Sequence, residues 1–183
     1  MYKQKRKKEM SIKILSFIFG TLMPISAFAA LPYVGLYQTI DDETNTPKSI
    51  VQLYEYQDGD NTELAGRIVA LYDANGVISE TLENPTRVAE KVKNTPKMVG
   101  LDIIWDMAWD ADDKEFGKGK IMDPKSGKIY SSVIWQDATD SLNVRGKIGP
   151  FGRTQKWNVM QATDLPGVLQ NIDTSNWTPV VHK

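Results

Sequence analysis

Polar and apolar residues alternate along most of this chain in short runs, and turn-forming residues separate one run from the next. A period of two is typical of a β-strand that buries one face and exposes the other. The alternation predicts eight strands. They cover residues 33–40, 49–56, 64–72, 98–107, 115–122, 128–136, 141–148 and 153–160.

The stretch 119–160 shows this pattern most regularly, because turn signals divide it into alternating runs. Its first turn extends from Asp123 to Gly127. There Pro124 presets φ, Asp123 is able to bond its own backbone, and Gly127 suits a positive φ. Turns of this kind join neighbouring strands into an antiparallel meander.

The number and spacing of the strands predict an all-β domain over residues 30–163. Eight antiparallel strands joined by hairpins form an eight-stranded up-and-down barrel when they close, and closure leaves no exposed sheet edge. Such a barrel is either filled by side chains or wide enough for one small ligand. A sandwich of two sheets is the alternative, because the spacing of turns does not distinguish the two architectures.

Two segments interrupt or follow the alternation. Residues 86–93, in an insertion before the fourth strand, are expected to form a short helix, since Val88 and Val92 stand four residues apart. The alternation stops before residues 164–183, which are expected to form a carboxy-terminal tail with one helical turn. We expect Trp177 of this tail to pack against the barrel.

Residues 1–29 have the regions of a secretory signal peptide. A basic start precedes an apolar stretch over 14–25, and an A-x-A cleavage signal ends at Ala29. The apolar stretch is shorter than the roughly 20 residues that a membrane span needs. We expect cleavage after Ala29 or Ala30, a periplasmic or secreted protein, and no membrane span after cleavage. An uncleaved amino-terminal anchor is the alternative.

The composition argues against several classes of function. The chain has 22 basic and 23 acidic residues, and the leader holds six of the basic ones and one acid, so residues 30–183 carry a net charge of −6. That charge argues against a nucleic-acid partner. The chain has no cysteine, and its single histidine is His182, next to the carboxyl end. Disulfides, thiolate or histidine metal sites and a Ser-His-Asp triad therefore lack their central residues.

The acidic residues do not indicate a metal site, and no cofactor is predicted. The cluster that starts at Asp110 superficially suggests a calcium loop, but Glu115 and Ile121 stand where an EF-hand needs Gly and Glu. A hydrolase that uses two carboxylates stays open in principle, although the spacing of the acids selects no pair. We therefore expect a protein without enzymatic activity.

Five motifs within residues 33–160 carry a resemblance to a known family. They are Gly35 with Thr39–Asp42, Leu64–Val69, Gly100-Leu101, Ile121–Tyr130, and Leu142–Gly149 with Gly152–Trp157. On these motifs the chain resembles the bacterial secreted family catalogued as domain of unknown function 2147, whose biochemical function is not established. The resemblance implies a lipocalin-like fold. The chain departs from the family at Tyr37, where Trp is usual, and lacks a cysteine pair that many members have before the Gly100 strand.

Three residues are expected to close the barrel. Gly35-Leu36-Tyr37 resembles the lipocalin Gly-x-Trp signature, in which the aromatic seals one end and an arginine from a late strand lies across it. A cation over an aromatic ring is favourable, and its stem covers apolar surface. Arg153 and Arg145 are the candidate partners, and Trp157 belongs to the core. Ligand binding is the alternative role for Tyr37 and Arg153.

Five residues are candidates for a ligand site. Arg67 and Arg145, like Lys147, stand in mid-strand, where a positive group either pairs with a carboxylate or binds an anionic ligand. Exposure on the outer face is the alternative for both. Trp105, Trp135 and Tyr54 are aromatics of the kind that line small-molecule sites, and aromatics also dominate ordinary cores.

These observations lead to three hypotheses. The first is a non-enzymatic binding protein that holds a small lipophilic or anionic molecule inside the barrel. The second is a filled barrel that acts through its surface as an envelope or host-facing protein-interaction module. The third is the carboxylate-pair hydrolase.

Overall fold

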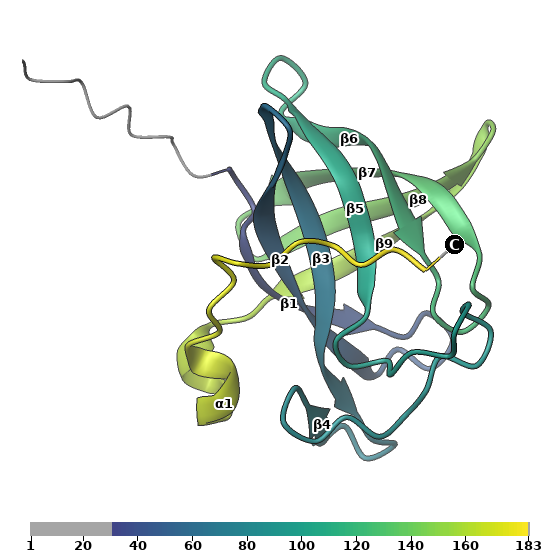
Figure 1. Ribbon diagram of the computed structural model, residues 1–183, viewed down its shortest axis with the longest axis vertical. Coiled ribbons are helices and arrows are strands. Elements are labelled where there is room, and N and C mark those ends of the chain that lie inside the picture. The colour runs from purple at the N-terminus through teal and green to yellow at the C-terminus, as the bar shows by residue number, and fades with distance from the viewer. Residues whose placement is uncertain (1–30, 183) are drawn as a thin grey trace, which may run out of the picture.

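The computed structural model describes residues 31–182, and the predicted signal peptide lies outside the described residues. Figure 1 shows strands curved around a common axis, with the last residues laid across their outside. Among residues 31–182, no helix is long and apolar enough to span a membrane. The strands are β1 (Gly35–Ile40), β2 (Pro47–Asp58), β3 (Asn61–Tyr72), β4 (Ile78–Thr81), β5 (Asp102–Asp110), β6 (Glu115–Met122), β7 (Ile129–Ala138), β8 (Ser141–Ile148) and β9 (Phe151–Val159).

Eight of these strands form a closed antiparallel ring. The order of neighbours is β2-β1-β9-β8-β7-β6-β5-β3, and a further pairing of β2 with β3 closes it. The seam between β1 and β9 includes the pairs Tyr37↔Val159 and Gln38↔Asn158. The short strand β4 pairs with β3 alone and adds to the end of that strand. The predicted eight-stranded barrel is confirmed, because a sandwich would leave the ring open.

The turn predicted from Asp123 to Gly127 connects β6 to β7. The Asp123 carboxylate accepts a hydrogen bond from the Lys125 N–H at 3.0 Å, and Gly127 has a φ of +69°. Side-chain to backbone bonds and a glycine at positive φ are the devices that such turns use. The local sequence is therefore sufficient to reverse the chain here.

The predicted helix over residues 86–93 is wrong. This segment folds back on itself instead, with a bridge between Val88 and Lys97 and a hydrogen bond from the Ala89 N–H to the Pro96 carbonyl at 2.8 Å. Val92 is buried whereas Val88 is exposed, so the two valines do not share one helical face. The N–H groups of Thr86 and Arg87 donate to the Glu80 carboxylate and hold the start of this loop in a non-helical conformation.

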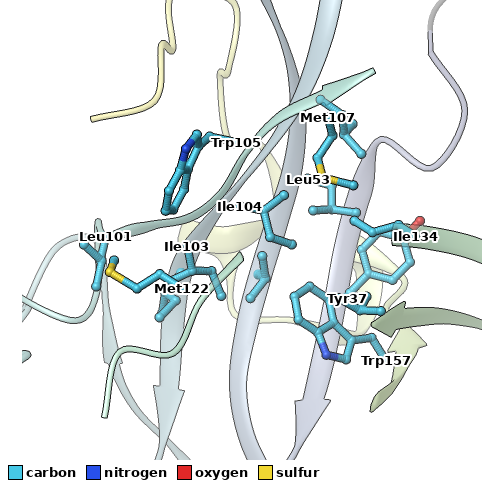
Figure 2. Close-up of a cluster of buried hydrophobic side chains, with 14 of the residues drawn as sticks. Tyr37, Leu53, Leu101, Ile103, Ile104, Trp105, Met107, Met122, Ile134 and Trp157 are labelled. Carbon is cyan, nitrogen blue, oxygen red and sulfur yellow. The ribbon is translucent and has the colours of Figure 1, made fainter. Parts of the chain in front are cut away.

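Side chains fill the interior of the barrel. Figure 2 shows Leu53, Ile104, Ile134 and Trp157, which come from four different strands, directed toward one another. Burial of each large apolar side chain contributes about 1.5–3 kcal/mol, and protein interiors tolerate few voids. The fully or nearly fully buried inner residues are Val51, Leu53, Leu64, Ile68, Ile104, Met107, Phe116, Ile134, Leu142, Val144 and Trp157.

The carboxy-terminal tail lies against the outer surface of the barrel. It begins with a 3-10 turn (Ala162–Asp164) and the one-turn helix α1 (Gly167–Gln170), and then crosses β2 and β3 as the yellow segment of Figure 1. Trp177 packs edge-on against Tyr54, with ring centroids 5.1 Å apart. The tail therefore covers part of the sheet that would otherwise face solvent.

Candidate functional site

Arg67 and Tyr54 lie together on the outer face of the barrel, where both bond to Asp102. A side chain on the preceding Gly66 would point at Leu53 in the interior, so Arg67 points outward. The Arg67 Nε donates to Asp102 Oδ1 at 2.9 Å and its Nη2 to Oδ2 at 2.8 Å, while the Tyr54 hydroxyl donates to Oδ1 at 2.7 Å. The Asp102 side chain is 0% exposed.

The tail completes this cluster from the solvent side. The Val180 N–H donates to Asp102 Oδ2 at 2.8 Å, and Arg67 Nη2 donates to the Thr178 carbonyl at 3.2 Å. The Trp177 ring covers the guanidinium of Arg67, with its centroid 4.3 Å from Cζ. The cluster of Tyr54, Arg67, Asp102, Trp177 and Val180 thus holds the tail in place, and we call it the tail latch.

The electrostatics of the tail latch agree with its geometry. Burial raises the pKa of the Tyr54 hydroxyl, and the negative charge of Asp102 raises it further. Burial alone would lower the pKa of Arg67, but the hydrogen bonds and charge of Asp102 raise it overall. Arg67 and Tyr54 therefore bond to Asp102 and hold the tail, and of the roles open to Arg67 the structure shows pairing with a carboxylate on the outer face.

Trp105 is buried in a part of the core that extends beyond the barrel interior. It follows Ile104 along β5, so the two side chains leave opposite faces of the sheet. Figure 2 shows Trp105 on the same side of the cluster as Leu101 and Met122. The residue is 1% exposed, and its Nε1 has no hydrogen-bond partner among residues 31–182. Trp105 is therefore a core residue, and it offers almost no surface to a ligand.

The three residues predicted to close the barrel do not form one group. Tyr37 and Trp157 are buried in the interior, and burial, followed by the charge of Tyr33, raises the pKa of Tyr37 to about 12. Arg153 is exposed and pairs with Asp42 in the turn between β1 and β2, at 2.8 Å. The expected placement of Arg153 across Tyr37 is therefore wrong, because a carboxylate within reach offers the guanidinium a stronger partner.

Arg145 and Trp135 lie together on the outer face of β6, β7 and β8. The inward residues Ile134 and Val144 are paired across β7 and β8, so their neighbours point outward. Arg145 stands opposite Val133, and Trp135 stands opposite Glu115. These side chains surround a recess of about 420 Å³, which we call the outer recess. Its lining consists of Asp113, Glu115, Val133, Trp135, Arg145 and Lys147.

The guanidinium of Arg145 is the unusual feature of the outer recess. Its Nε is buried but has no hydrogen-bond partner among the described residues. Space for the side chain comes from Gly152, where an added Cβ would stand 2.7 Å from Arg145 Nε and 2.9 Å from the Gly146 carbonyl oxygen. A buried polar group without a partner is costly, so the Nε is held in this position at the expense of stability.

The sequence pointed to Arg145, Lys147 and Trp135 of the outer recess, but it did not bring Asp113 and Glu115 to the same place. Glu115 and Asp113 became neighbours of Arg145 only through the pairing of β6, β7 and β8, whereas Lys147 follows Arg145 by two residues and shares its face by alternation. A correct strand register would have found Glu115, because it lies directly opposite Trp135 and directly opposite residues share a face. No local motif marks these two acids.

A second recess of about 610 Å³ lies where the tail crosses β2. It is lined by Val34, by residues 55–57 of β2 and by residues 174–178 of the tail. At its edge the Glu55 carboxylate accepts a hydrogen bond from the Leu31 N–H. Because the tail forms one wall, the shape of this recess depends on the tail latch.

Acidic and histidine side chains do not gather into a metal site in the part of the chain that the structure describes. No group of three or more His, Cys, Asp or Glu residues within 31–182 is arranged to hold a metal ion. The turn acids bond their own backbone, as Asp110 does with the N–H groups of Asp112 and Asp113.

Comparison with known proteins identifies a family and a similar fold. The family model described as "Uncharacterized protein conserved in bacteria (DUF2147)" matches residues 35–159. Among solved structures, HP1028 from the human pathogen Helicobacter pylori, described as belonging to the lipocalin family, is similar with a TM-score of 0.51 and 19% identity. The similarity covers 72% of this chain and 84% of HP1028. The comparison with curated proteins found no match.

Proposed function

The chain belongs to the bacterial family described as uncharacterized protein DUF2147, and we propose that it is a non-enzymatic binding protein. Its ligand is a small, partly apolar molecule with an acidic group. The ligand lies in the outer recess, against Arg145 and Trp135. The observation that carries this proposal is the outer recess of about 420 Å³, in which the cations Arg145 and Lys147 lie beside the apolar side chain of Trp135.

The packing of the interior favours the outer recess over the inside of the barrel. Leu53, Ile104, Phe116, Ile134 and Leu142 are each 0% exposed and meet in the interior. A ligand there would have to displace well-packed side chains, at a cost comparable to that of a large core substitution. The outer recess accepts a molecule without such displacement.

The lining of the outer recess defines the chemistry of the ligand. Arg145 and Lys147 supply positive charge and N–H donors for a carboxylate, sulfate or phosphate. Trp135 and Val133 form an apolar wall against which a ring or short chain packs. Glu115 supplies an acceptor, so a hydroxyl or amine on the ligand would be recognised in addition.

The proposed location of the protein and its proposed lack of enzymatic activity rest on the sequence. Residues 1–29 have the regions of a signal peptide, and a periplasmic or secreted protein follows from its cleavage after Ala29 or Ala30. The chain has no cysteine and one histidine, so the usual nucleophile and base pairs are not available to it.

Native mass spectrometry of the protein purified from its own host tests the proposal. We expect a small-molecule adduct on the wild type that is lost in Arg145→Met, which keeps the side-chain stem over Gly152 but removes the charge. Lys156→Met is the matched control, because Lys156 is an exposed cation of the neighbouring strand β9. Thermal unfolding would verify that both variants fold. An unliganded wild type, or an adduct that survives Arg145→Met, would contradict the proposal.

The filled interior also favours one alternative, in which the barrel acts through its surface as an envelope or host-facing interaction module. Fully buried Leu53, Ile134 and Trp157 would then serve only the rigidity of the scaffold. The same native spectra distinguish the two functions, because a module of this kind would carry a protein partner and no small molecule.

A further inference from the structure

The tip of the β8–β9 hairpin exposes two large apolar side chains. Phe151 is 80% exposed and Ile148 is 63% exposed, and the two are paired across the hairpin. Figure 1 shows the hairpin projecting beyond the end of the barrel. Single exposed apolar residues are common on soluble proteins, but a paired phenylalanine and isoleucine at a projecting tip would be costly to leave in water.

The backbone of this tip is adapted to an apolar environment. Gly149 and Pro150 form the turn between the two strands, and Gly149 has a φ of +56°. Proline has no N–H group, so the turn presents one polar donor fewer at the point that projects furthest. Unpaired backbone groups are the main penalty when a loop enters lipid, and this turn reduces that penalty.

Basic residues flank the apolar pair. Lys147 precedes Ile148 and leaves the opposite face of β8, and Arg153 follows Phe151 by two residues and is 68% exposed. A third cation, Lys120, lies on the same outer face as Lys147. Lys147 is paired with Ser131 across β7 and β8, and Ser131 is paired with Lys120 across β6 and β7. Asp42 is the carboxylate paired with Arg153.

From this arrangement we infer that the hairpin tip docks the protein on an anionic lipid surface. Ile148 and Phe151 enter the boundary between headgroups and acyl chains, and Lys147 and Arg153 contact the lipid headgroups. Shallow insertion of apolar side chains combined with attraction to anionic lipid is a recognised mode of peripheral binding. The net charge of −6 for residues 30–183 would otherwise repel such a surface, so the cations at this tip determine the orientation.

A lipid surface fits the shape of the tip better than a protein partner does. Specific protein interfaces usually bury more than about 1,000 Å² over complementary surfaces. A convex turn with two apolar side chains offers only a small area, whereas a bilayer closes around any convex shape. The inference shares Lys147 with the ligand site proposed above, but Ile148 and Phe151, the residues that its test changes, do not line the outer recess.

Flotation with lipid vesicles tests the inference. The protein is purified from its own host and mixed with vesicles of phosphatidylcholine alone or of phosphatidylcholine with phosphatidylglycerol. We expect binding to the anionic vesicles at low salt, and binding weakened at least about tenfold by either Phe151→Ser or Ile148→Ser. Val77→Ser is the matched control, because Val77 is 60% exposed at the turn between β3 and β4, beside an acidic residue rather than a cation.

Each outcome of this experiment is decisive. Loss of binding in Phe151→Ser together with normal binding of Val77→Ser supports the inference, provided that circular dichroism shows both variants folded. Failure of the wild type to bind anionic vesicles overturns it, and so does equal binding of Phe151→Ser. Equal binding to both kinds of vesicle overturns the role of Lys147 and Arg153. A protein partner that requires Phe151 when no vesicle binds would assign the tip to that partner instead.

Discussion

Removal of the carboxylate at the centre of the tail latch should both destabilise the barrel and release its tail. In Asp102→Ala the guanidinium of Arg67 loses its bidentate partner, and the Tyr54 hydroxyl and the Val180 N–H lose their acceptor. These groups are largely covered, since the Arg67 side chain is 16% exposed. The remaining charge must be hydrated, and the tail must move to admit water.

The magnitude follows from the burial of the pair. Loss of one member of a buried ion pair costs about 3–5 kcal/mol, because the other charge is left without a partner. Release of the tail lets water reach Arg67, so we expect a loss of about 2–4 kcal/mol in the free energy of unfolding. That loss is a large part of the roughly 5–15 kcal/mol typical of a domain.

Urea unfolding at pH 7 measures the loss, and hydrogen exchange over residues 171–182 measures the release of the tail. The control is Lys125→Ala, which breaks the ion pair with Asp41 at the surface. The Lys125 side chain is 61% exposed, so we expect this variant to lose less than about 1 kcal/mol. An Asp102→Ala variant that loses less than about 1 kcal/mol and keeps slow exchange in the tail would refute the reasoning.

Three further outcomes are expected. The pKa of Glu80 is lowered to about 2, because the N–H groups of Thr86 and Arg87 and the Arg87 side chain outweigh the effect of burial. This stabilisation is complete above about pH 4.5 and is lost as the pH falls toward 2. Glu80→Gln should therefore lower the free energy of unfolding at pH 7 by roughly 1–3 kcal/mol and flatten the acid limb of a plot of that free energy against pH. An unchanged acid limb would contradict this. Gly66→Ala should cost about 1–3 kcal/mol in thermal unfolding, because the new Cβ would stand 2.8 Å from a methyl group of a neighbouring core leucine, and a neutral result would indicate a looser interior. Trp157→Ala should cost about 3–5 kcal/mol in urea unfolding, and a cost below 1 kcal/mol would argue against its place in the core.

The loop between β4 and β5 shows how far the local sequence determines the structure. The valines at 88 and 92 have helical spacing, and isolated peptides with that spacing favour a helix weakly at best. In the barrel, the Glu80 carboxylate binds the backbone N–H groups of Thr86 and Arg87, at 2.7 and 2.9 Å, and directs the chain into a loop. A contact between residues six and seven positions apart therefore overrode the local preference.

The candidate site shows the same limit. Arg67 and Arg145 have similar sequence settings, each beside a glycine in mid-strand, and both leave the outer face of the barrel. Arg67 bonds to the buried carboxylate of Asp102 and to the tail, whereas Arg145 lies in the outer recess. Sequence spacing alone did not distinguish a latch from a candidate binding group.

The sequence by itself determined the eight strands of the barrel and the turn at Asp123–Gly127, because a period of two and the chemistry of turns act over a few residues. The spacing of turns left a two-sheet sandwich open, and it was the pairing of β2 with β3 that closed the ring. Only the tertiary structure decided the face, the partner and the exposure of each candidate side chain. Register shifts, such as the one between Gly66 and Arg67, change which residues share a face. Contacts across the chain, such as Arg67 with Thr178 and Arg153 with Asp42, depend on strand pairing and on the path of the tail, which local patterns do not encode.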